Sequence, residues 1–557
     1  MPLMTGSKFF VQTLQGYGIT HAFYMPMVVT GALVEMEKVG IRRIMTHSEK
    51  AAAYMADGYA RAAHRAGICM AQNVGAANLA AGLQDAYLAC SPVIALTGRA
   101  TSMQQYRHHY QEIDHIQLFA AVTKYNVTVD STEQLPHLLR QAFREATSGA
   151  PGPVHLDLQG NTGSVIMDAE ADLEVIVEAP FTHVPPFRSE AEIGMIREAL
   201  HLLARASRPV IVAGGGVASS QAQREVVELA ERLSIPVVTS LNAKGTIPDH
   251  HPLSVGVCGT YSRWCANRVV SEADLVFFIG SHTGSQVTTE WQIPRVGSPV
   301  IQLDIDPSEL GRSYPIQVGL HGDAKATLRK MLEVAEPSAP RAEWLGRVQE
   351  LVHAWREEVA PLAHSDASPI RPERLCTELT AWLPNNAVLV TDTGHSGIWT
   401  GTMVDAKHPN QMFLRCAGSL GWAFPAAIGV KCALPDRPVV CFTGDGGFWY
   451  HLSELETAVR YGINTVTVIN NNHSLNQEKR GNERYYAGQP GNVEELWVFP
   501  DTDFSKLAQD MGGFGIRVHH PSEIQAALDK AVASGKPAVV DIVSDINGIA
   551  PRAWTPS

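Results

Sequence analysis

Short apolar runs alternate with amphipathic stretches along almost the whole chain. Apolar runs bounded by turn residues are typical of buried parallel strands, whereas apolar residues spaced three and four apart are typical of helices. The predicted strands are 65–72, 92–97, 151–158, 208–217, 235–240, 273–281, 299–307, 386–392, 437–445, 464–471 and 536–543. Their alternation with helices predicts an α/β fold in which helices flank parallel sheets.

Two proline-rich segments, 178–187 and 335–344, divide this pattern into three blocks. A chain of 557 residues is also long enough for three domains of ordinary size. The predicted domains are 1–175, 188–335 and 365–545, followed by an irregular tail at 546–557. The first and third blocks end in similar strands, PGPVHLDL and KPAVVDIV, which favours a duplicated fold.

The composition is that of a globular protein, with 45% hydrophobic and 18% charged residues, and it argues against disorder. The formal net charge of −12 disfavours nucleic acid or an anionic membrane as the main partner, because no overall positive field attracts phosphates. The N-terminus lacks the basic and apolar regions of a signal peptide, and the chain has no run of 18 apolar residues. We therefore expect a soluble, cytoplasmic protein.

Eight cysteines are spread along the chain, and none belongs to a Cys-x-x-Cys pair. Several lie inside apolar runs, such as VVCFTG around Cys441. This favours reduced core residues over disulfides or a zinc site.

The most specific motif is Gly444-Asp445-Gly446-Gly447, which directly follows a predicted strand. A helix candidate and a second strand ending in three asparagines, 470–472, come next. Glycines at a strand end let backbone N–H groups approach a phosphate, and the following helix directs its positive N-terminus at it. Asp445 and an asparagine from the neighbouring strand end would supply hard oxygen ligands for Mg²⁺. Gly-Asp-Gly alone is a common turn, but this order of strand, motif, helix, strand and asparagines is much more specific.

This arrangement resembles the thiamine-diphosphate motif, in which GDG is followed after some two dozen residues by NN. The resemblance implies that Mg²⁺ is held by Asp445, Asn472 and the backbone carbonyl of Ser474. The triple asparagine leaves a second register open, in which the ligands would be Asn471 and His473. We prefer the first register, because it also places a glutamate of the intervening helix in line with the family.

A second match to the same family is THSEKAAAYMADGYAR at 46–61, where Glu49 precedes Gly58 by nine positions. Members similar to acetolactate synthase carry a glutamate at this spacing. The resemblance implies that Glu49 hydrogen-bonds N1′ of the aminopyrimidine and favours the imino tautomer, whose N4′ then removes the C2 proton of the thiazolium. The alternative is an ordinary helix glutamate that faces solvent.

Two further segments are similar to the family's cofactor site. CAGSLGWAFPAAIG at 416–429 resembles the segment in which an aliphatic residue wedges between the two cofactor rings. The residue implied here is Leu420, with the carbonyl of Gly418 accepting a hydrogen bond from N4′. TDTGHSGIW at 391–399 resembles the loop that touches the diphosphate. Its candidate residues are Gly394, His395 and Ser396.

The resemblance covers essentially the whole chain and implies a pyrimidine-binding first domain, a middle domain and a diphosphate-binding third domain. In the family the glutamate and the GDG motif come from different subunits, so a homodimer or a homotetramer is expected. Relatives use the middle domain for FAD or for the ADP part of coenzyme A. Here AGGG at 213–216 and Asp304 are the candidates for such a nucleotide, although glycine-rich strand ends in this family are often empty.

The substrate pocket is less well determined by the sequence. YQEID at 110–114 resembles a pocket segment of acetolactate synthases, which nominates Gln111. Glu478 falls where some decarboxylases of the superfamily place a catalytic glutamate, and it is either a proton shuttle or a charged helix residue. A basic group either binds a carboxylate or phosphate, or lies on a solvated loop; its members are Arg99, Arg107, His108 and His109.

Departures from the family are concentrated near the reactive carbon. Ser48 stands where histidine is usual, QNVGAAN at 72–78 replaces SGPGATN, and Met27 replaces a small residue. Met25, Met27, Val28 and Leu475 either form an apolar wall of the pocket or belong to the core.

The sequence therefore predicts a thiamine-diphosphate- and Mg²⁺-dependent enzyme that cleaves or forms a carbon–carbon bond next to a carbonyl. The first candidate is decarboxylation or carboligation of a 2-oxo acid, as in acetolactate synthases. The second is a lyase of the 2-hydroxyacyl-CoA or oxalyl-CoA type, with the C-terminal tail as a lid. A catalytically inert thiamine-diphosphate-binding regulatory subunit is the alternative of another class, and the presence of Glu49 argues against it.

Overall fold

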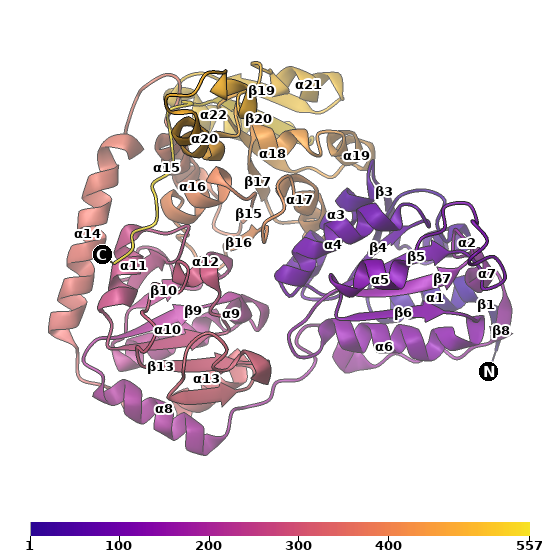
Figure 1. Ribbon diagram of the computed structural model, residues 1–557, viewed down its shortest axis with the longest axis horizontal. Coiled ribbons are helices and arrows are strands. Elements are labelled where there is room, and N and C mark those ends of the chain that lie inside the picture. Colours follow the sequence, from indigo (N-terminus) through magenta and orange to yellow (C-terminus); the bar gives the residue numbers. More distant parts are fainter. Residues whose placement is uncertain (1, 557) are drawn as a thin grey trace.

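The computed structural model describes residues 2–556 and has three parallel six-stranded sheets, each flanked by helices (Figure 1). Each sheet is built from the strands of one of the three blocks. We call the parts around them the N-terminal, middle and C-terminal units. The predicted α/β fold class is confirmed, and each of the eleven predicted strands coincides with an observed one.

The N-terminal unit has the strand order β3-β2-β4-β5-β7-β6. A small antiparallel pair, β1 (Leu3–Thr5) and β8 (Glu170–Asp172), lies beside it. The sheet strands are β2 (His21–Tyr24), β3 (Arg42–Met45), β4 (Gly67–Ala71), β5 (Val93–Arg99), β6 (Tyr125–Val129) and β7 (Val154–Gln159). The helices are α1 (Gly6–Gly16), α2 (Thr30–Lys38), α3 (Glu49–Ala63), α4 (Ala76–Leu88), α5 (His115–Ala120), α6 (Leu135–Thr147) and α7 (Ser164–Met167).

The C-terminal unit repeats this order as β16-β15-β17-β18-β20-β19, so the predicted duplicated fold is confirmed at the level of topology. Its strands are β15 (Val388–Thr391), β16 (Met412–Arg415), β17 (Val439–Gly444), β18 (Val466–Asn471), β19 (Phe514–Val518) and β20 (Ala538–Val543). Its helices are α15 (Pro372–Trp382), α16 (His395–Met403), α17 (Ala423–Ala433), α18 (Asp445–Trp449), α19 (Glu454–Tyr461), α20 (Lys479–Tyr486), α21 (Phe504–Asp510) and α22 (Ile524–Ala533).

The middle unit has a different order, β11-β10-β9-β12-β13-β14, which is that of dinucleotide-binding folds. Its strands are β9 (Pro209–Ala213), β10 (Val237–Thr239), β11 (Ser254–Val257), β12 (Leu275–Ile279), β13 (Val300–Asp304) and β14 (Val318–His321). Its helices are α8 (Ile193–Arg205), α9 (Gly215–Ser219), α10 (Gln223–Leu233), α11 (Trp264–Glu272), α12 (Ser285–Thr288) and α13 (Ala324–Val334).

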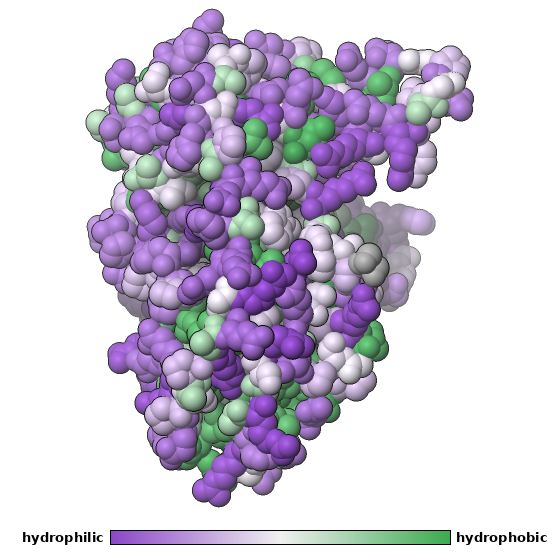
Figure 2. All heavy atoms as spheres, turned by 90° about the vertical axis from the view of Figure 1, so that its left-hand side faces the viewer, coloured by the Kyte–Doolittle hydropathy of each residue, from purple (hydrophilic) through white to green (hydrophobic). Residues whose placement is uncertain are grey.

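A long helix, α14 (Ala342–Ala363), connects the middle and C-terminal units and begins inside the second proline-rich joint. It packs on α11 and α15 along one side of the molecule (Figure 1). The molecular face on that side is mostly hydrophilic, with scattered hydrophobic side chains (Figure 2). Beyond Val543, residues 545–556 contain no helix or strand, as predicted for the tail.

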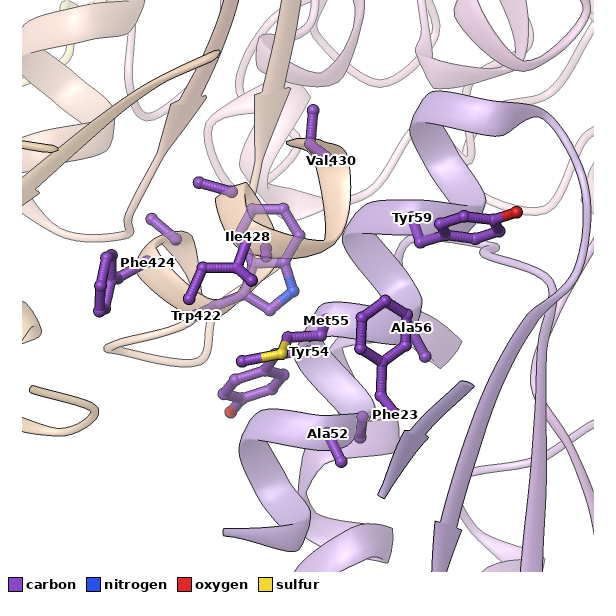
Figure 3. Close-up of a cluster of buried hydrophobic side chains, with 14 of the residues drawn as sticks. Phe23, Ala52, Tyr54, Met55, Ala56, Tyr59, Trp422, Phe424, Ile428 and Val430 are labelled. Carbon is purple, nitrogen blue, oxygen red and sulfur yellow. The ribbon is translucent and has the colours of Figure 1, made fainter. Parts of the chain in front are cut away.

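The N-terminal and C-terminal units pack against each other through α3 and α17 (Figure 3). Side chains from both helices, including Tyr54, Met55 and Phe424, belong to one buried cluster. The helix backbones touch, since a Cβ added to Gly58 would lie 2.2 Å from the carbonyl oxygen of Ala426. The close contact between the two helices therefore explains why position 58 is a glycine.

No helix within residues 2–556 is long and apolar enough to cross a membrane. The bounds of the three predicted domains, their cofactor roles and the cytoplasmic location stay predictions.

Candidate active site

Three neighbouring strands of the C-terminal unit end where the GDG motif lies. β15, β17 and β18 are adjacent, and the strand order reverses between β15 and β17. Ligands of open parallel sheets bind at such a switch point, beyond the carboxyl ends of the strands. Here β17 ends at Gly444, and Asp445 begins α18 directly after it.

Asp445 is buried, with 2% of its surface exposed, and it forms no salt bridge with any of residues 2–556. Burial raises the pKa of Asp445 to about 7, while backbone N–H groups that include those of Ser474, Gly446 and Asn472 act in the opposite direction. A buried carboxylate without a cation is costly. Its surroundings therefore fit a bound divalent cation, which would compensate the charge.

The two asparagines named by the alternative registers have different hydrogen-bond partners. The side-chain amide of Asn471 donates to the carboxylate of Asp541 at 2.8 Å and to the carbonyl of Thr502 at 3.0 Å. Asn472, in contrast, accepts a hydrogen bond from the hydroxyl of Ser474 at 2.8 Å. The side chain of Asn471 is thus engaged by hydrogen bonds within the C-terminal unit, whereas that of Asn472 lies beside Ser474.

The loop after β15 lies next to the GDG motif. Gly394 has φ 62°, which favours glycine, and it precedes α16. A Cβ added to Gly444 would lie 3.6 Å from the hydroxyl oxygen of Ser396, so these two predicted residues are neighbours. The pKa of His395 is lowered to about 4, mainly by burial and further by Arg480. The N-terminus of α16 and the glycines of the motif thus form one polar edge that suits a diphosphate.

Asp392 is a buried residue of this site that the sequence analysis did not nominate. It follows β15, and its carboxylate accepts hydrogen bonds from the N–H groups of Gly421 and Ala423, at 3.0 and 3.2 Å. Burial raises the pKa of Asp392 to about 6. Asp392 could have been nominated from the sequence, because it ends the predicted strand 386–392.

Asp85 is the second missed residue, and it comes from the N-terminal unit. Its carboxylate accepts from the backbone N–H groups of Ala417, Gly418 and Ser419, and it pairs with Arg61. These bonds hold the loop that carries the predicted residues Gly418 and Leu420. Asp85 could have been nominated from the sequence, because it is the single charged residue of the helix AANLAAGLQDAYL.

Glu49 is the first residue of α3 and is half-buried. Its carboxylate accepts from the side-chain amide of Asn78 at 3.2 Å and lies 2.5 Å from where a Cβ on Gly75 would be. Among the described residues, no hydrogen bond or salt bridge joins Glu49 to the C-terminal unit. The backbone N–H of nearby His47 does reach the C-terminal unit, because it donates a hydrogen bond to the carboxylate of Glu454.

Gln111 lies in the loop after β5, with φ 66° and a half-buried side chain. The loop is fixed by Asn161, which donates to the carbonyl of Tyr110 and contacts His109 at 3.1 Å. Asn73 donates to the same Asn161 at 3.0 Å. Asn73 is two residues from Gly75, so Gln111 and Glu49 lie at the same edge of the N-terminal unit.

The structure corrects two predicted groupings. Arg99 is buried and pairs with Asp130, so its charge is compensated inside the unit, whereas Arg107 and His108 are exposed. The predicted basic group is therefore not one anion site. Val28 lies in the core of the N-terminal unit instead of a pocket wall.

Leu475 does lie against the GDG motif, with a methyl carbon 2.5 Å from where a Cβ on Gly446 would be. Glu478 is exposed at the end of a short 3-10 helix (Asn476–Glu478) and has no hydrogen-bonded partner among the described residues. The C-terminal tail lies along this segment, because the side chain of Asn476 donates to the carbonyls of Ile546 and Gly548.

The middle unit has a cavity of about 240 Å³ at the carboxyl ends of β9, β12 and β13. Asp304 and the glycines 215 and 216 line it. The close packing of the chain explains part of the glycine pattern, since a Cβ on Gly214 would lie 2.1 Å from the carbonyl oxygen of Gly280. The cavity is therefore present, but the glycines alone do not require a nucleotide.

Three family models match the chain in consecutive regions. The thiamine pyrophosphate enzyme N-terminal TPP binding domain matches residues 4–118, the central domain matches 196–331, and the C-terminal TPP binding domain matches 392–542.

Full-length relatives agree with these matches. The chain is 35% identical to a probable acetolactate synthase large subunit of Methanocaldococcus jannaschii, over 97% of this chain and 92% of the relative. It is 30% identical to the acetolactate synthase isozyme 1 large subunit of Escherichia coli, over 97% and 94%. It is 28% identical to the acetolactate synthase large subunit of Buchnera aphidicola, over 98% and 95%.

Proposed function

The chain belongs to the thiamine pyrophosphate enzyme family, and we propose that its active site forms between the GDG edge of one copy and Glu49 of a second copy. The protein is a thiamine-diphosphate-dependent enzyme of the type that forms or cleaves a carbon–carbon bond next to a carbonyl.

Asp445, Asn472 and the backbone carbonyl of Ser474 would hold Mg²⁺, which would compensate the negative charge of the diphosphate. The observation that carries this proposal is the buried carboxylate of Asp445, which has no salt-bridge partner among the described residues. A carboxylate, an amide and a carbonyl are the hard oxygen ligands that Mg²⁺ prefers. The remaining proposed diphosphate contacts are Gly394, His395, Ser396, Gly444, Gly446 and Gly447.

Glu49 would complete the site from a second copy of the chain. This is supported by the position of its carboxylate, which contacts Asn78 and Gly75 of its own unit. Large apolar side chains are also exposed on the loops at the same edge, and a second copy would cover them. They are Met27, Val74, Met103, Tyr106 and Tyr110. We propose a homodimer as the smallest active form, and a homotetramer as a pair of such dimers.

Thiamine diphosphate, when bound, supplies an acidic carbon that reacts with carbonyl groups. Glu49 would hold a proton at N1′ of the aminopyrimidine. The carbonyl of Gly418 would accept a hydrogen bond from N4′, and Leu420 would pack against the cofactor rings. Gln111 would orient the substrate, and the exposed carboxylate of Glu478 would move a proton at the mouth of the site.

The proposed substrate class is a 2-oxo acid that is decarboxylated and joined to a second carbonyl compound. Its support is the full-length similarity to proteins named acetolactate synthase large subunits. A lyase for 2-hydroxyacyl-CoA or oxalyl-CoA is the second candidate, favoured by the tail that contacts Asn476. Incubation with pyruvate, other 2-oxo acids and acyl-CoA compounds, with product analysis by NMR, distinguishes them. Turnover of acyl-CoA compounds alone would contradict the first candidate.

We further propose that the middle cavity receives the adenine nucleotide part of FAD, ADP or coenzyme A. The support is its place at the switch point between β9 and β12, with Asp304 available for a ribose hydroxyl. Calorimetric titration with each nucleotide tests this. Absence of binding by all three would refute it.

The split active site is tested by mixing two inactive variants. Glu49→Gln subunits retain the GDG edge, and Asp445→Ala subunits retain Glu49. If subunits exchange, the mixture should regain part of the activity, because some sites then combine two intact halves. Subunit exchange is checked by native mass spectrometry of differently tagged chains. Full exchange without any regained activity would contradict the proposal.

A further inference from the structure

Cys90 differs from the other seven cysteines, which are buried, because it is half-buried. It lies just after α4 of the N-terminal unit and faces the middle unit. It lines both the 240 Å³ cavity and a second cavity of about 660 Å³ between the units. The sequence analysis placed all cysteines in the core, and for Cys90 that prediction is wrong. A small molecule in either cavity would therefore meet this thiol.

His282 of the middle unit pairs with Cys90, with 3.9 Å between the sulfur and Nε2. The hydrogen bond to Cys90 raises the pKa of His282 to about 9, against the effect of burial and with help from nearby carboxylates. An imidazolium beside a thiol stabilises the thiolate, which is the nucleophilic form.

Other charged groups face this pair from both units. Lys124 is on the N-terminal side, where its pKa is lowered mainly by burial. Three carboxylates lie on the middle side and favour the protonated form of His282; they are Asp304, Asp306 and Glu309.

A second observation points to a ligand at this place. Thr283, next to His282, lines the smaller cavity and is 1% exposed. Its hydroxyl has no hydrogen-bond partner among the described residues. Buried polar groups normally have partners, so this hydroxyl is suited to a group bound in the cavity.

The backbone also indicates a role for the side chain of Cys90. Its φ is 52°, at a helix end where glycine is the usual residue. Such a conformation is less favourable for cysteine than for glycine, and strained residues of this kind cluster at functional sites.

We propose that Cys90 is a modification site that exchanges with low-molecular-weight disulfides, so that the added group lies in the cavity lined by Thr283. The thiolate of Cys90 attacks one sulfur of a disulfide RS–SR. The S–S bond of the disulfide breaks, a new Cys90–S–SR bond forms, and RS⁻ leaves with the electron pair. The disulfide itself is the oxidant, and a free thiol reverses the step.

The added group would occupy the mouth shared by the two cavities, which Cys90 and Asn242 both line. The modification therefore controls access to the middle unit. This holds whichever compound the cavity receives, so the inference does not depend on the proposed nucleotide or substrate.

The experiment uses the native oligomer and the aromatic disulfide 5,5′-dithiobis(2-nitrobenzoate), whose released thiolate is coloured. One thiol per chain should react rapidly in the wild-type protein, and Cys90→Ser should abolish this phase. His282→Gln should slow it about tenfold or more at pH 7, because the thiolate loses its imidazolium. The matched control is His64→Gln, since His64 lines the larger cavity beside Cys90 but makes no hydrogen bond to it.

The pH dependence separates a reactive thiol from one that is merely accessible. At both pH 7 and pH 8 the wild-type protein should react faster than His282→Gln, because His282 stays protonated over this range. In His282→Gln the rate should rise about tenfold over the same unit, as for an ordinary thiol. A rapid phase that persists in Cys90→Ser, or equal rates in wild type and His282→Gln, would overturn the proposal. Absence of any rapid phase in the folded wild type would do the same.

Discussion

The carboxylate of Asp85, on α4 of the N-terminal unit, accepts a hydrogen bond from the backbone N–H of Gly418 in the C-terminal unit, at 3.1 Å. The neighbouring N–H groups of Ala417 and Ser419 point to the same carboxylate. Because buried Asp85 also pairs with half-buried Arg61, its charge is compensated on both sides. The loop proposed to meet the cofactor rings is therefore held by the docking of one unit on the other.

Replacing Asp85 by asparagine should weaken cofactor binding about 10- to 100-fold. The amide has one acceptor oxygen in place of two and brings N–H donors toward other N–H groups, and a hydrogen bond to a charged group contributes about 1.5–3 kcal/mol. The measurement is calorimetric titration with thiamine diphosphate and Mg²⁺. Asp510→Asn, an exposed change on α21, is the control. Unchanged affinity in Asp85→Asn would show that the loop keeps its position without this carboxylate.

Replacing Glu49 by glutamine should slow hydrogen exchange at C2 of the bound cofactor by about 10²–10⁴-fold, the usual contribution of a general acid or base. Glutamine is nearly isosteric, so the cofactor should remain bound. Exchange is followed by acid quench and NMR, with Glu174→Gln on the surface as the control. Exchange within about threefold of wild type would mean that Glu49 is not the group that holds the proton.

The asparagine register is tested by a pair of alanine variants. Asn472→Ala should weaken Mg²⁺-dependent cofactor binding, because it removes a proposed ligand. Asn471→Ala should instead lower the free energy of unfolding by about 1–3 kcal/mol, because it leaves the carboxylate of Asp541 without its amide partner.

Cofactor titrations with and without EDTA, and denaturant unfolding, are measured for both variants. Asp445→Ala serves as the positive control and should lose cofactor binding while it keeps its fold. The reverse pattern in the two asparagine variants would assign the metal to Asn471.

Stability should fall in mild acid, in part because of His155. Burial lowers the pKa of His155 to about 3, against 6.5 in the unfolded chain. The unfolded state therefore binds a proton below pH 6.5 that the folded state does not, and stability is lost as the pH falls from 6.5. Between pH 7 and 5 this linkage amounts to about 2 kcal/mol.

The test compares the denaturant unfolding of wild type and His155→Gln at both pH values. The variant loses contacts with Thr97 and Asn126 and should be less stable at pH 7. Its deficit should shrink by about 2 kcal/mol at pH 5, because it lacks the titrating group. His201→Gln, at an exposed position, should show no such change. A deficit that is equal at both pH values would contradict the assignment.

The hydrophobic pattern located eleven strands, and most of the strands it missed lie at sheet edges. All six edge strands were missed, together with β2 and the small pair β1 and β8. Several edge strands are only partly buried, as β6 and β16 are, so they lack a continuous apolar run. Strands in the middle of a sheet are covered on both faces, and their burial is therefore visible in the local sequence.

The α/β class, the GDG edge and the match of Glu49 to a known spacing could be predicted from the sequence, because each depends on residues close together in the chain. Only the tertiary structure placed Asp85 on the loop at Gly418, turned Asn471 toward Asp541, and brought Cys90 to His282. The partners in these pairs are separated by 333, 70 and 192 positions. Strand and helix periods reflect local backbone geometry, whereas such contacts arise from how whole units pack, and no local pattern encodes them.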